Sequence, residues 1–181
     1  MKAMRGIGLF ALAALLVAGC GGGGSGDGSG GGATDTVAAG PPLTRFAAVT
    51  FRGTDGSLHR IADYQGRILV VNLVASWQDD SRAIVEIMNE IQHKFKANVD
   101  VIAVTVDDRG AEGARQFKMQ TGATFDVFVG TDSVRGQFGS PGRLPATYVF
   151  MRNSMEFARL EGLHRYIYYH NTIIKMYQQR L

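Results

Sequence analysis

The residues that could do chemistry gather in one segment, Trp77-Gln78-Asp79-Asp80-Ser81, between an apolar run and a helical pattern. The start of a helix is a favourable place for a reactive group, because the helix dipole stabilises negative charge there. Gln78, however, is an amide and cannot act as a nucleophile. Ser81 carries a hydroxyl, but the sequence identifies no base that would activate it. We therefore expect no catalytic residue in this segment.

The residue counts disfavour both thiol chemistry and metal binding. The chain of 181 residues has a single cysteine, Cys20, which excludes an intramolecular disulfide and a cysteine-based zinc site. The four histidines, which lack a metal-binding spacing such as His-Glu-x-x-His, are His59, His93, His164 and His170. Asp79 and Asp80 are better explained as an acidic helix start that caps free N–H groups than as a cation site. We expect no metal and no cofactor.

The first residues of the chain are typical of an export signal. Met1 to Arg5 is positively charged, and Ile7 to Ala18 is an apolar run too short to span a bilayer. Leu16-Val17-Ala18-Gly19-Cys20 resembles the bacterial lipobox, which implies cleavage before Cys20 and lipid attached to that cysteine. Gly21, rather than Asp, comes next, which by resemblance to enterobacterial sorting signals favours the outer membrane in a Gram-negative host. The alternative is an ordinary signal with an incidental cysteine.

A glycine-rich stretch, Gly21 to Gly32 (GGGGSGDGSGGG), has no apolar side chains to bury and predicts a flexible tether. We therefore expect a signal peptide (residues 1–19), a lipidated cysteine with its tether (20–43) and one folded domain (44–181). Without Lys2 and Arg5 of the signal, 17 basic residues face 16 acidic ones, so we expect no nucleic-acid partner. The expected membrane contact is the lipid on Cys20, with the domain in the periplasm.

The pattern of the domain predicts strands and helices in alternation. Apolar and β-branched runs predict strands at 46–52, 58–61, 68–75, 100–106, 125–129, 147–151 and 156–160, of which 68–75 is buried and central and 125–129 is a short edge segment. Helical spacing predicts helices after Trp77 and at 111–121, 132–138 and 166–179. In the terminal helix we expect Ile167, Ile174 and Tyr177 to face inward. This order predicts an α/β fold with a mixed sheet flanked by helices.

The same residues resemble the thioredoxin superfamily, specifically its membrane-anchored TlpA/ResA-like branch. The segments that carry the resemblance are Asp55-Gly56 with Leu58, Gly66 to Trp77, Arg82 with Glu86, Asp107, Leu144-Pro145-Ala146-Thr147, and Gly162. The resemblance implies a thioredoxin-like three-layer sandwich and a cis proline at Pro145. It also implies a groove for an extended peptide client, lined by Trp77, Gln78, Asp79, Asp80, Ser81, Leu144 and Pro145.

The sequence departs from this family at the positions that would carry its chemistry. The family has Trp-Cys-x-x-Cys where this chain has Trp77-Gln78-Asp79-Asp80-Ser81, so Gln78 and Ser81 are degenerate positions. Disulfide exchange needs a thiolate and a second thiol to resolve the mixed disulfide. Neither is present, and the acidic pair would raise the pKa of any nearby thiol. Conventional disulfide reductase or isomerase activity is therefore excluded.

Three classes of function stay open. The first is a binding or scaffold module of the cell envelope, whose client is an envelope protein or an extended peptide. The second is an enzyme, including a TlpA-like oxidoreductase role with thiols supplied by a partner. The third is a purely structural lipoprotein. Fold alone does not choose between them.

Overall fold

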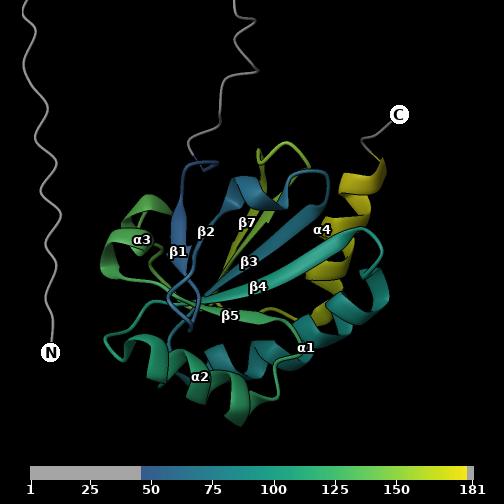
Figure 1. The fold of residues 1–181 in the computed structure, drawn as a ribbon. Coiled ribbons are helices and arrows are strands. Elements are labelled where there is room, and N and C mark those ends of the chain that lie inside the picture. The colour runs from purple at the N-terminus through teal and green to yellow at the C-terminus, as the bar shows by residue number, and fades with distance from the viewer. Residues whose placement is uncertain (1–45, 179–181) are drawn as a thin grey trace, which may run out of the picture. The chain divides into compact units, whose positions relative to one another are not determined.

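The computed structural model describes residues 46–178, which form a sheet with helices on both faces (Figure 1). In chain order the elements are β1 (Thr50–Arg52), β2 (Leu58–Arg60), a 3-10 helix (Ile61–Tyr64), β3 (Ile68–Val74), α1 (Asp79–Phe95), β4 (Val99–Thr105), α2 (Gly110–Thr121), β5 (Asp126–Val129), α3 (Asp132–Gln137), β6 (Ala146–Phe150), β7 (Glu156–Glu161) and α4 (Tyr166–Gln178). This order confirms the predicted alternation. The predicted signal, lipid site and tether lie outside the described residues.

The seven strands lie in the order β2-β1-β5-β4-β3-β6-β7. Strands β3, β4 and β5 are parallel, β6 is antiparallel to β3, and β7 is antiparallel to β6. The carboxyl ends of β3, β4, β5 and β7 therefore lie at the same end of the sheet, together with the amino end of β6. Loops after parallel strands converge at such an end, which makes it the place to look for a binding site.

The predicted α/β sandwich with a mixed sheet is confirmed by how the two faces of the sheet are covered. Alternate residues of β3 point to opposite faces, so each face has its own apolar core. Helices α1, α2 and α4 cover one face, where the buried residues include Val70, Met88, Phe117 and Ile173. The other face is covered by α3, the 3-10 helix and the segment that begins at Phe46. Phe46 packs there against Phe138, Tyr148 and Phe150.

The predicted edge position of segment 125–129 in the sheet is wrong. Segment 125–129 is not an edge, because β1 pairs with β5 through Arg52 and Val129 and places β5 inside the sheet. The sequence of the β1–β2 hairpin does not indicate which strand of the sheet this hairpin pairs with.

Helix α4 buries a different face from the predicted one. Its buried side chains are Tyr169, Ile173 and Met176, whereas Ile167 is 48% exposed. Ile174 and Tyr177 are only half-buried. The residues at 169, 173 and 176 follow helical spacing as well as the predicted set does, and packing in the apolar core that α4 shares with α1 selects between the two faces.

Asn72, the polar residue inside the central strand, has hydrogen-bond partners on both sides. Asn72 donates to the carbonyl of Ile102 in β4 at 3.3 Å and accepts from the hydroxyl of Thr147 in β6 at 2.8 Å. The side chain of Asn72 therefore links β3 to both of its neighbouring strands.

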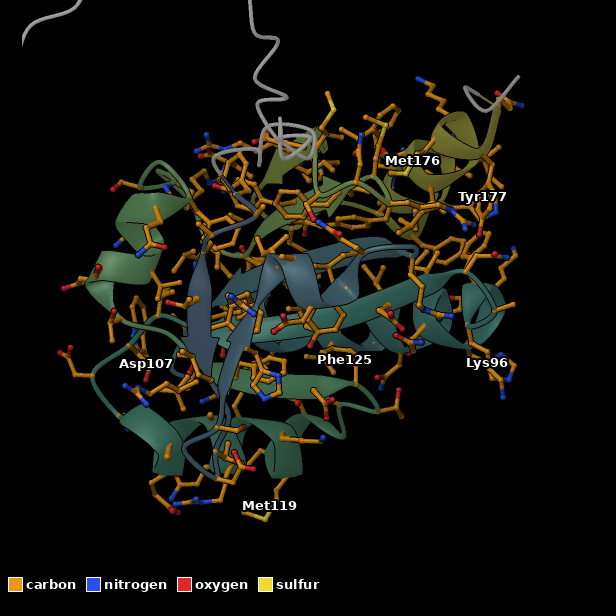
Figure 2. All side chains as sticks on the ribbon, turned by 45° about the horizontal axis from the view of Figure 1, so that its top comes forward. Lys96, Asp107, Met119, Phe125, Met176 and Tyr177 are labelled. Atoms are coloured by element: carbon orange, nitrogen blue, oxygen red, sulfur yellow. The ribbon has the colours of Figure 1, made fainter. Side chains whose placement is uncertain are left out.

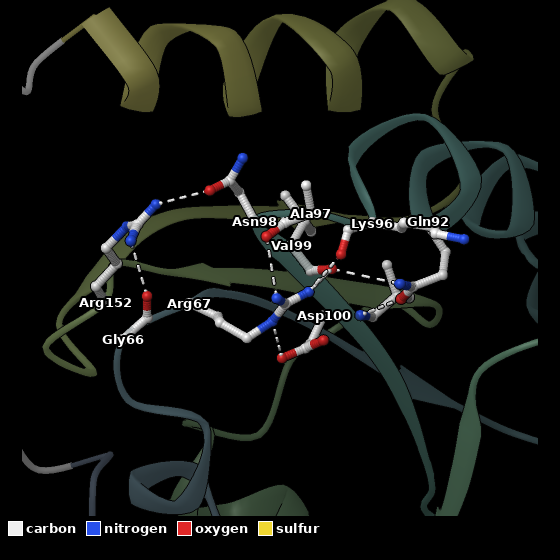
Figure 3. A network of polar contacts seen from close by, with 10 residues as sticks. Gly66, Arg67, Gln92, Lys96, Ala97, Asn98, Val99, Asp100 and Arg152 are labelled. Carbon is white, nitrogen blue, oxygen red and sulfur yellow. Dashed lines mark hydrogen bonds and ion pairs between the residues drawn. The ribbon is translucent and has the colours of Figure 1, made fainter.

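At the amino ends of β3 and β4, one arginine fastens the end of α1 to the sheet (Figure 3). Arg67 donates to the Asp100 carboxylate at 2.6 Å and to the carbonyls of Lys96, Ala97 and Val99. The carbonyls at a helix end lack partners within the helix, and a guanidinium can serve several of them at once. Within residues 46–178, no helix is both long and apolar enough to cross a bilayer.

Candidate functional site

Five loops lie together at the end of the sheet where β3, β4 and β5 terminate, and we call them the mouth. They comprise residues 75–78, 106–109, 130–132, 140–145 and 162–165. In Figure 2, Asp107 of the mouth and Lys96, which precedes β4, lie at opposite sides of the domain. The mouth brings together the predicted segments 77–81 and 144–145, which are separated by more than sixty positions in the sequence. The topology alone explains this, because β3 and β6 are neighbours of opposite direction.

Gln78 and Ser81, the two degenerate positions, are hydrogen-bonded to each other and to the surrounding backbone. The Gln78 amide nitrogen donates to the carbonyl of Leu144 at 2.9 Å. The Ser81 hydroxyl donates to the Gln78 side-chain oxygen at 3.3 Å and accepts from the N–H of Ala75 at 3.1 Å. Ser81 is fully buried. Its hydroxyl contacts no basic group, so the arrangement holds the loops and offers no activated nucleophile.

The two aspartates that follow begin helix α1, but they do not cap it. Gln78 is the N-cap residue, and no side chain makes a capping hydrogen bond there. The Asp79 side chain is 97% exposed and pairs with Arg82 at 3.6 Å. The predicted cap is therefore wrong, because Asp79 and Asp80 occupy the first and second helical positions rather than the N-cap position. Their charge still favours the positive end of the helix dipole.

Trp77 is the most exposed of the predicted site residues apart from Asp79, at 66%. It forms one wall of a depression of about 330 Å³, whose other lining residues are Val106, Asp107, Asp108, Arg109 and Asp132. These residues come from the ends of β3, β4 and β5, so the depression follows from the parallel order of the three strands. An exposed indole beside a hollow is a frequent anchor in protein interfaces.

Asp107 fixes the loop that carries Trp77. One of its carboxylate oxygens accepts from the Ser76 N–H at 2.7 Å, and the other accepts from the Arg109 N–H at 3.1 Å. Arg82 donates to the Ser76 carbonyl from the other side. These contacts show that Asp107 positions the mouth.

The opposite wall of the mouth is the loop that leads into β6. The Leu144–Pro145 peptide is cis, as the resemblance implied. The carbonyl of Pro145 accepts from the N–H of Gly162, which places the exposed Leu163 next to this loop. Leu144 is half-buried and Pro145 is buried.

Glu161 holds this second wall, and sequence reasoning missed it. One of its carboxylate oxygens accepts from the backbone N–H groups of Gly142 at 3.0 Å and Arg143 at 3.4 Å, and the other pairs with Arg159 at 2.6 Å. Nothing in the sequence signals this role, because a glutamate at a strand end is ordinary and its partners lie nearly twenty positions earlier. Asp108 and Asp132 were missed as wall residues for the same reason.

A larger depression, of about 520 Å³, lies away from the mouth between the β1–β2 turn, α2 and β5. In it the Ser57 hydroxyl contacts the Asp55 carboxylate at 2.5 Å and the His59 ring nitrogen at 2.8 Å. The hydrogen bond from the Ser57 hydroxyl lowers the pKa of Asp55. The aspartate touches the serine rather than the histidine, so the three residues do not form a catalytic triad.

Residues 46–178 contain no group of three or more His, Cys, Asp or Glu side chains placed to hold a metal. The mouth has carboxylates, but Asp107 already accepts two backbone hydrogen bonds. The chemistry that the mouth offers is hydrogen bonding, charge and an exposed aromatic surface.

A model of the AhpC/TSA family matches residues 42–155, which is most of the described domain. The chain belongs to the AhpC/TSA family. The matched range of this AhpC/TSA member includes both walls of the mouth up to Pro145 and ends before Glu161.

Solved structures share the thioredoxin-like fold of this AhpC/TSA chain. A proposed thiol:disulfide interchange protein DsbE from Chlorobium tepidum is 23% identical, with a TM-score of 0.64, and the match covers 70% of this chain and 91% of that one. A secreted Mycobacterium tuberculosis disulfide oxidoreductase homologous to Escherichia coli DsbE is 12% identical, with a TM-score of 0.62 and coverage of 72% and 97%. A DsbF homologue from Corynebacterium diphtheriae is 19% identical, with a TM-score of 0.63 and coverage of 70% and 83%. At these identities the comparison shows the fold alone.

Proposed function

We propose that this AhpC/TSA member is a redox-inactive, thioredoxin-like lipoprotein of the cell envelope. Its mouth binds an extended segment of another envelope protein. The observation that carries the proposal is the pair Gln78 and Ser81, whose side chains bond to Leu144, to Ala75 and to each other. Both walls of the mouth are kept in place without a thiol.

The loss of thiol chemistry rests on the amino acids themselves. The single cysteine, Cys20, precedes the described domain and is the proposed site of lipid attachment. A cysteine peroxidase and a disulfide reductase both need a thiolate in the domain. Binding needs only shape and exposed contact surface, which Trp77 and Leu163 supply.

The proposed location is the periplasmic side of a membrane, with the lipid on Cys20 as the anchor. The sequence before the tether supports this through its apolar run and its lipobox-like end. One of the similar structures is that of a secreted protein, which agrees with export. Fractionation of cells labelled with a radioactive or clickable fatty acid tests the anchor, because Cys20→Ser removes the label if the proposal is right.

Binding at the mouth is tested by placing a photo-crosslinking amino acid at position 77 of the full-length protein in cells that produce it. We expect a discrete crosslinked partner from position 77. The matched control is position 119, since Met119 is also strongly exposed, at 74% against 66% for Trp77, but lies on α2 beside the other depression. Identical crosslinking patterns from the two positions would contradict the proposal.

Redox inactivity is tested separately with the full-length protein. Insulin reduction with dithiothreitol or glutathione as the external thiol, and peroxide consumption under the same conditions, should proceed at the rates of buffer alone. If the mouth used external or partner thiols, the rate of insulin reduction or of peroxide consumption would exceed the rate in buffer. A rate that exceeds the buffer rate in the wild type and returns toward it in Gln78→Ala would overturn the proposal.

A further inference from the structure

We propose that the depression beside Trp77 receives the side chain of a lysine or arginine in the segment that the mouth binds. This inference rests on the proposed function, which says that a segment binds, and adds which residue type the mouth selects. Three observations carry it: the exposed indole, two carboxylates that form no ion pair with any described residue, and the local excess of negative charge.

The first observation is the position of the indole. Trp77 is exposed and forms one wall of a depression of about 330 Å³, at the small end of the volumes that ligand pockets have. A space of this size fits a single long side chain. The face of a tryptophan attracts an ammonium or guanidinium group more strongly than any other side-chain ring does, and the alkyl stem of lysine or arginine can lie along it.

The second observation is the state of the carboxylates that line the same depression. Asp107 is occupied by the N–H groups of Ser76 and Arg109. Asp108 and Asp132 are exposed, and neither has an ion pair within the part of the chain that the structure describes. They come from the loops after β4 and β5, so a cation seated against Trp77 would meet a carboxylate from each loop.

The third observation is the charge balance. The depression is lined by three carboxylates and one guanidinium, that of Arg109. The described domain as a whole is close to neutral, with 15 basic and 14 acidic residues between positions 46 and 178. Among the described residues Arg109 forms no ion pair with any of the three aspartates, and the stem of its side chain lies over the bare Cα of Gly113. Charge complementarity therefore favours a cationic occupant.

Trp77 is the only tryptophan of the chain, so its fluorescence reports on this depression alone. The test titrates the full-length protein, held in detergent micelles, with three peptides that differ at one position: acetyl-Ala-Val-Arg-Val-Ala-amide and its Gln and Glu counterparts. We expect the Arg peptide to change the emission with a dissociation constant about tenfold lower than that of the Gln peptide. The Glu peptide should bind more weakly still, and added salt should narrow the difference.

The double variant Asp108→Asn, Asp132→Asn should bring the Arg peptide to the affinity of the Gln peptide and leave the Gln peptide unchanged. Glu86→Gln, Glu90→Gln is the matched control: it removes the same charge from exposed positions on α1 and should keep the preference. If the Arg and Gln peptides both change the emission with equal affinity, the cation preference is wrong while binding at the mouth stands. If no peptide changes the emission and position 77 gives no crosslink, both proposals are overturned.

Discussion

At the scale of single residues, the mouth is held together by groups that cannot exchange electrons. Gln78 and Ser81 are polar and partly or fully buried, so each must find hydrogen-bond partners or destabilise the fold. They find these partners in each other and in the backbone of Ala75 and Leu144. The retained geometry and the absent thiols are therefore compatible.

This geometry predicts that a dithiol can be restored. In the variant Gln78→Cys, Ser81→Cys, built in a Cys20→Ser background, the two thiols lie three residues apart at a helix start, the spacing of Cys-x-x-Cys proteins. We expect oxidation to an intramolecular disulfide and measurable insulin reduction. Adding Asp79→Asn, Asp80→Asn should lower the thiol pKa and raise the thiolate fraction at neutral pH, because two nearby negative charges are removed.

Thiol titration with and without oxidant checks the disulfide, and the two single-cysteine variants serve as controls that should stay inactive. Two thiols that remain free after oxidation would show that the former site has lost more than its cysteines.

A second residue-scale prediction concerns the buried pair Asn72 and Thr147. Thr147→Val removes the donor to the Asn72 oxygen and should lower the free energy of unfolding by about 1–3 kcal/mol, because a buried polar atom is left without its partner. Asn72→Leu should cost a similar amount, and the double variant should cost less than the two single losses added together. Urea denaturation of all four proteins measures this coupling, and strict additivity would mean that the hydrogen bond contributes nothing.

At the scale of elements, the wall made by residues 140–145 depends on β7. Glu161 at the end of β7 accepts from the N–H groups of Gly142 and Arg143. Glu161→Gln keeps the shape but loses the charge that strengthens these bonds. We expect faster hydrogen exchange at the amides of Gly142 and Arg143, by several-fold, with little change in the core strands.

Hydrogen exchange followed by mass spectrometry or NMR makes this measurement. Glu90→Gln, an exposed change on α1 with no contact to the loop, is the control and should leave the exchange unchanged. An unaltered loop in Glu161→Gln would mean that the cis-proline segment holds itself in place.

The elements were predictable where a local pattern settled them. The run ILVVNLVA predicted β3, and the spacing of Ile84, Met88 and Ile91 predicted α1, because burial on one face leaves a period in the sequence. The face of α4 and the position of β5 were not predictable. Both depend on which partner the element meets, and the partner is remote in the chain.

The site was predictable only where a resemblance pointed to it. Trp77, Gln78 and Leu144 were identified in this way, and β3 and β6 do bring them together. Asp108, Asp132 and Glu161 were missed, since single carboxylates at strand ends carry no motif. Their roles come from tertiary placement.

At the scale of the whole molecule, the fold should lose stability in alkali. Burial, followed by the negative charges of Asp126, Asp100 and Asp63, raises the pKa of Tyr64 above its usual value of 10.0. Burial also raises the pKa of Tyr169. A raised pKa means that the folded state binds the phenol proton more tightly, so this stabilisation is present below pH 10 and is lost as the pH rises above it.

We expect the urea midpoint to fall more steeply between about pH 9.5 and 11 in the wild type than in Tyr64→Phe, which has no phenol proton to lose. Measurement of the midpoint at half-unit steps of pH checks this. Parallel curves for the two proteins would show that Tyr64 ionises as freely in the fold as in the unfolded chain.

The position of the Phe46 ring bears on how a partner reaches the mouth. Its ring packs on Phe150 and Tyr148, which lie opposite Leu69 and Val71 in the first half of β3, whereas the mouth begins beyond Val74. The Phe46 ring therefore lies toward the amino end of β3, away from the end at which Trp77 follows the strand. A partner that contacts the indole would approach the opposite end of the sheet from this aromatic cluster.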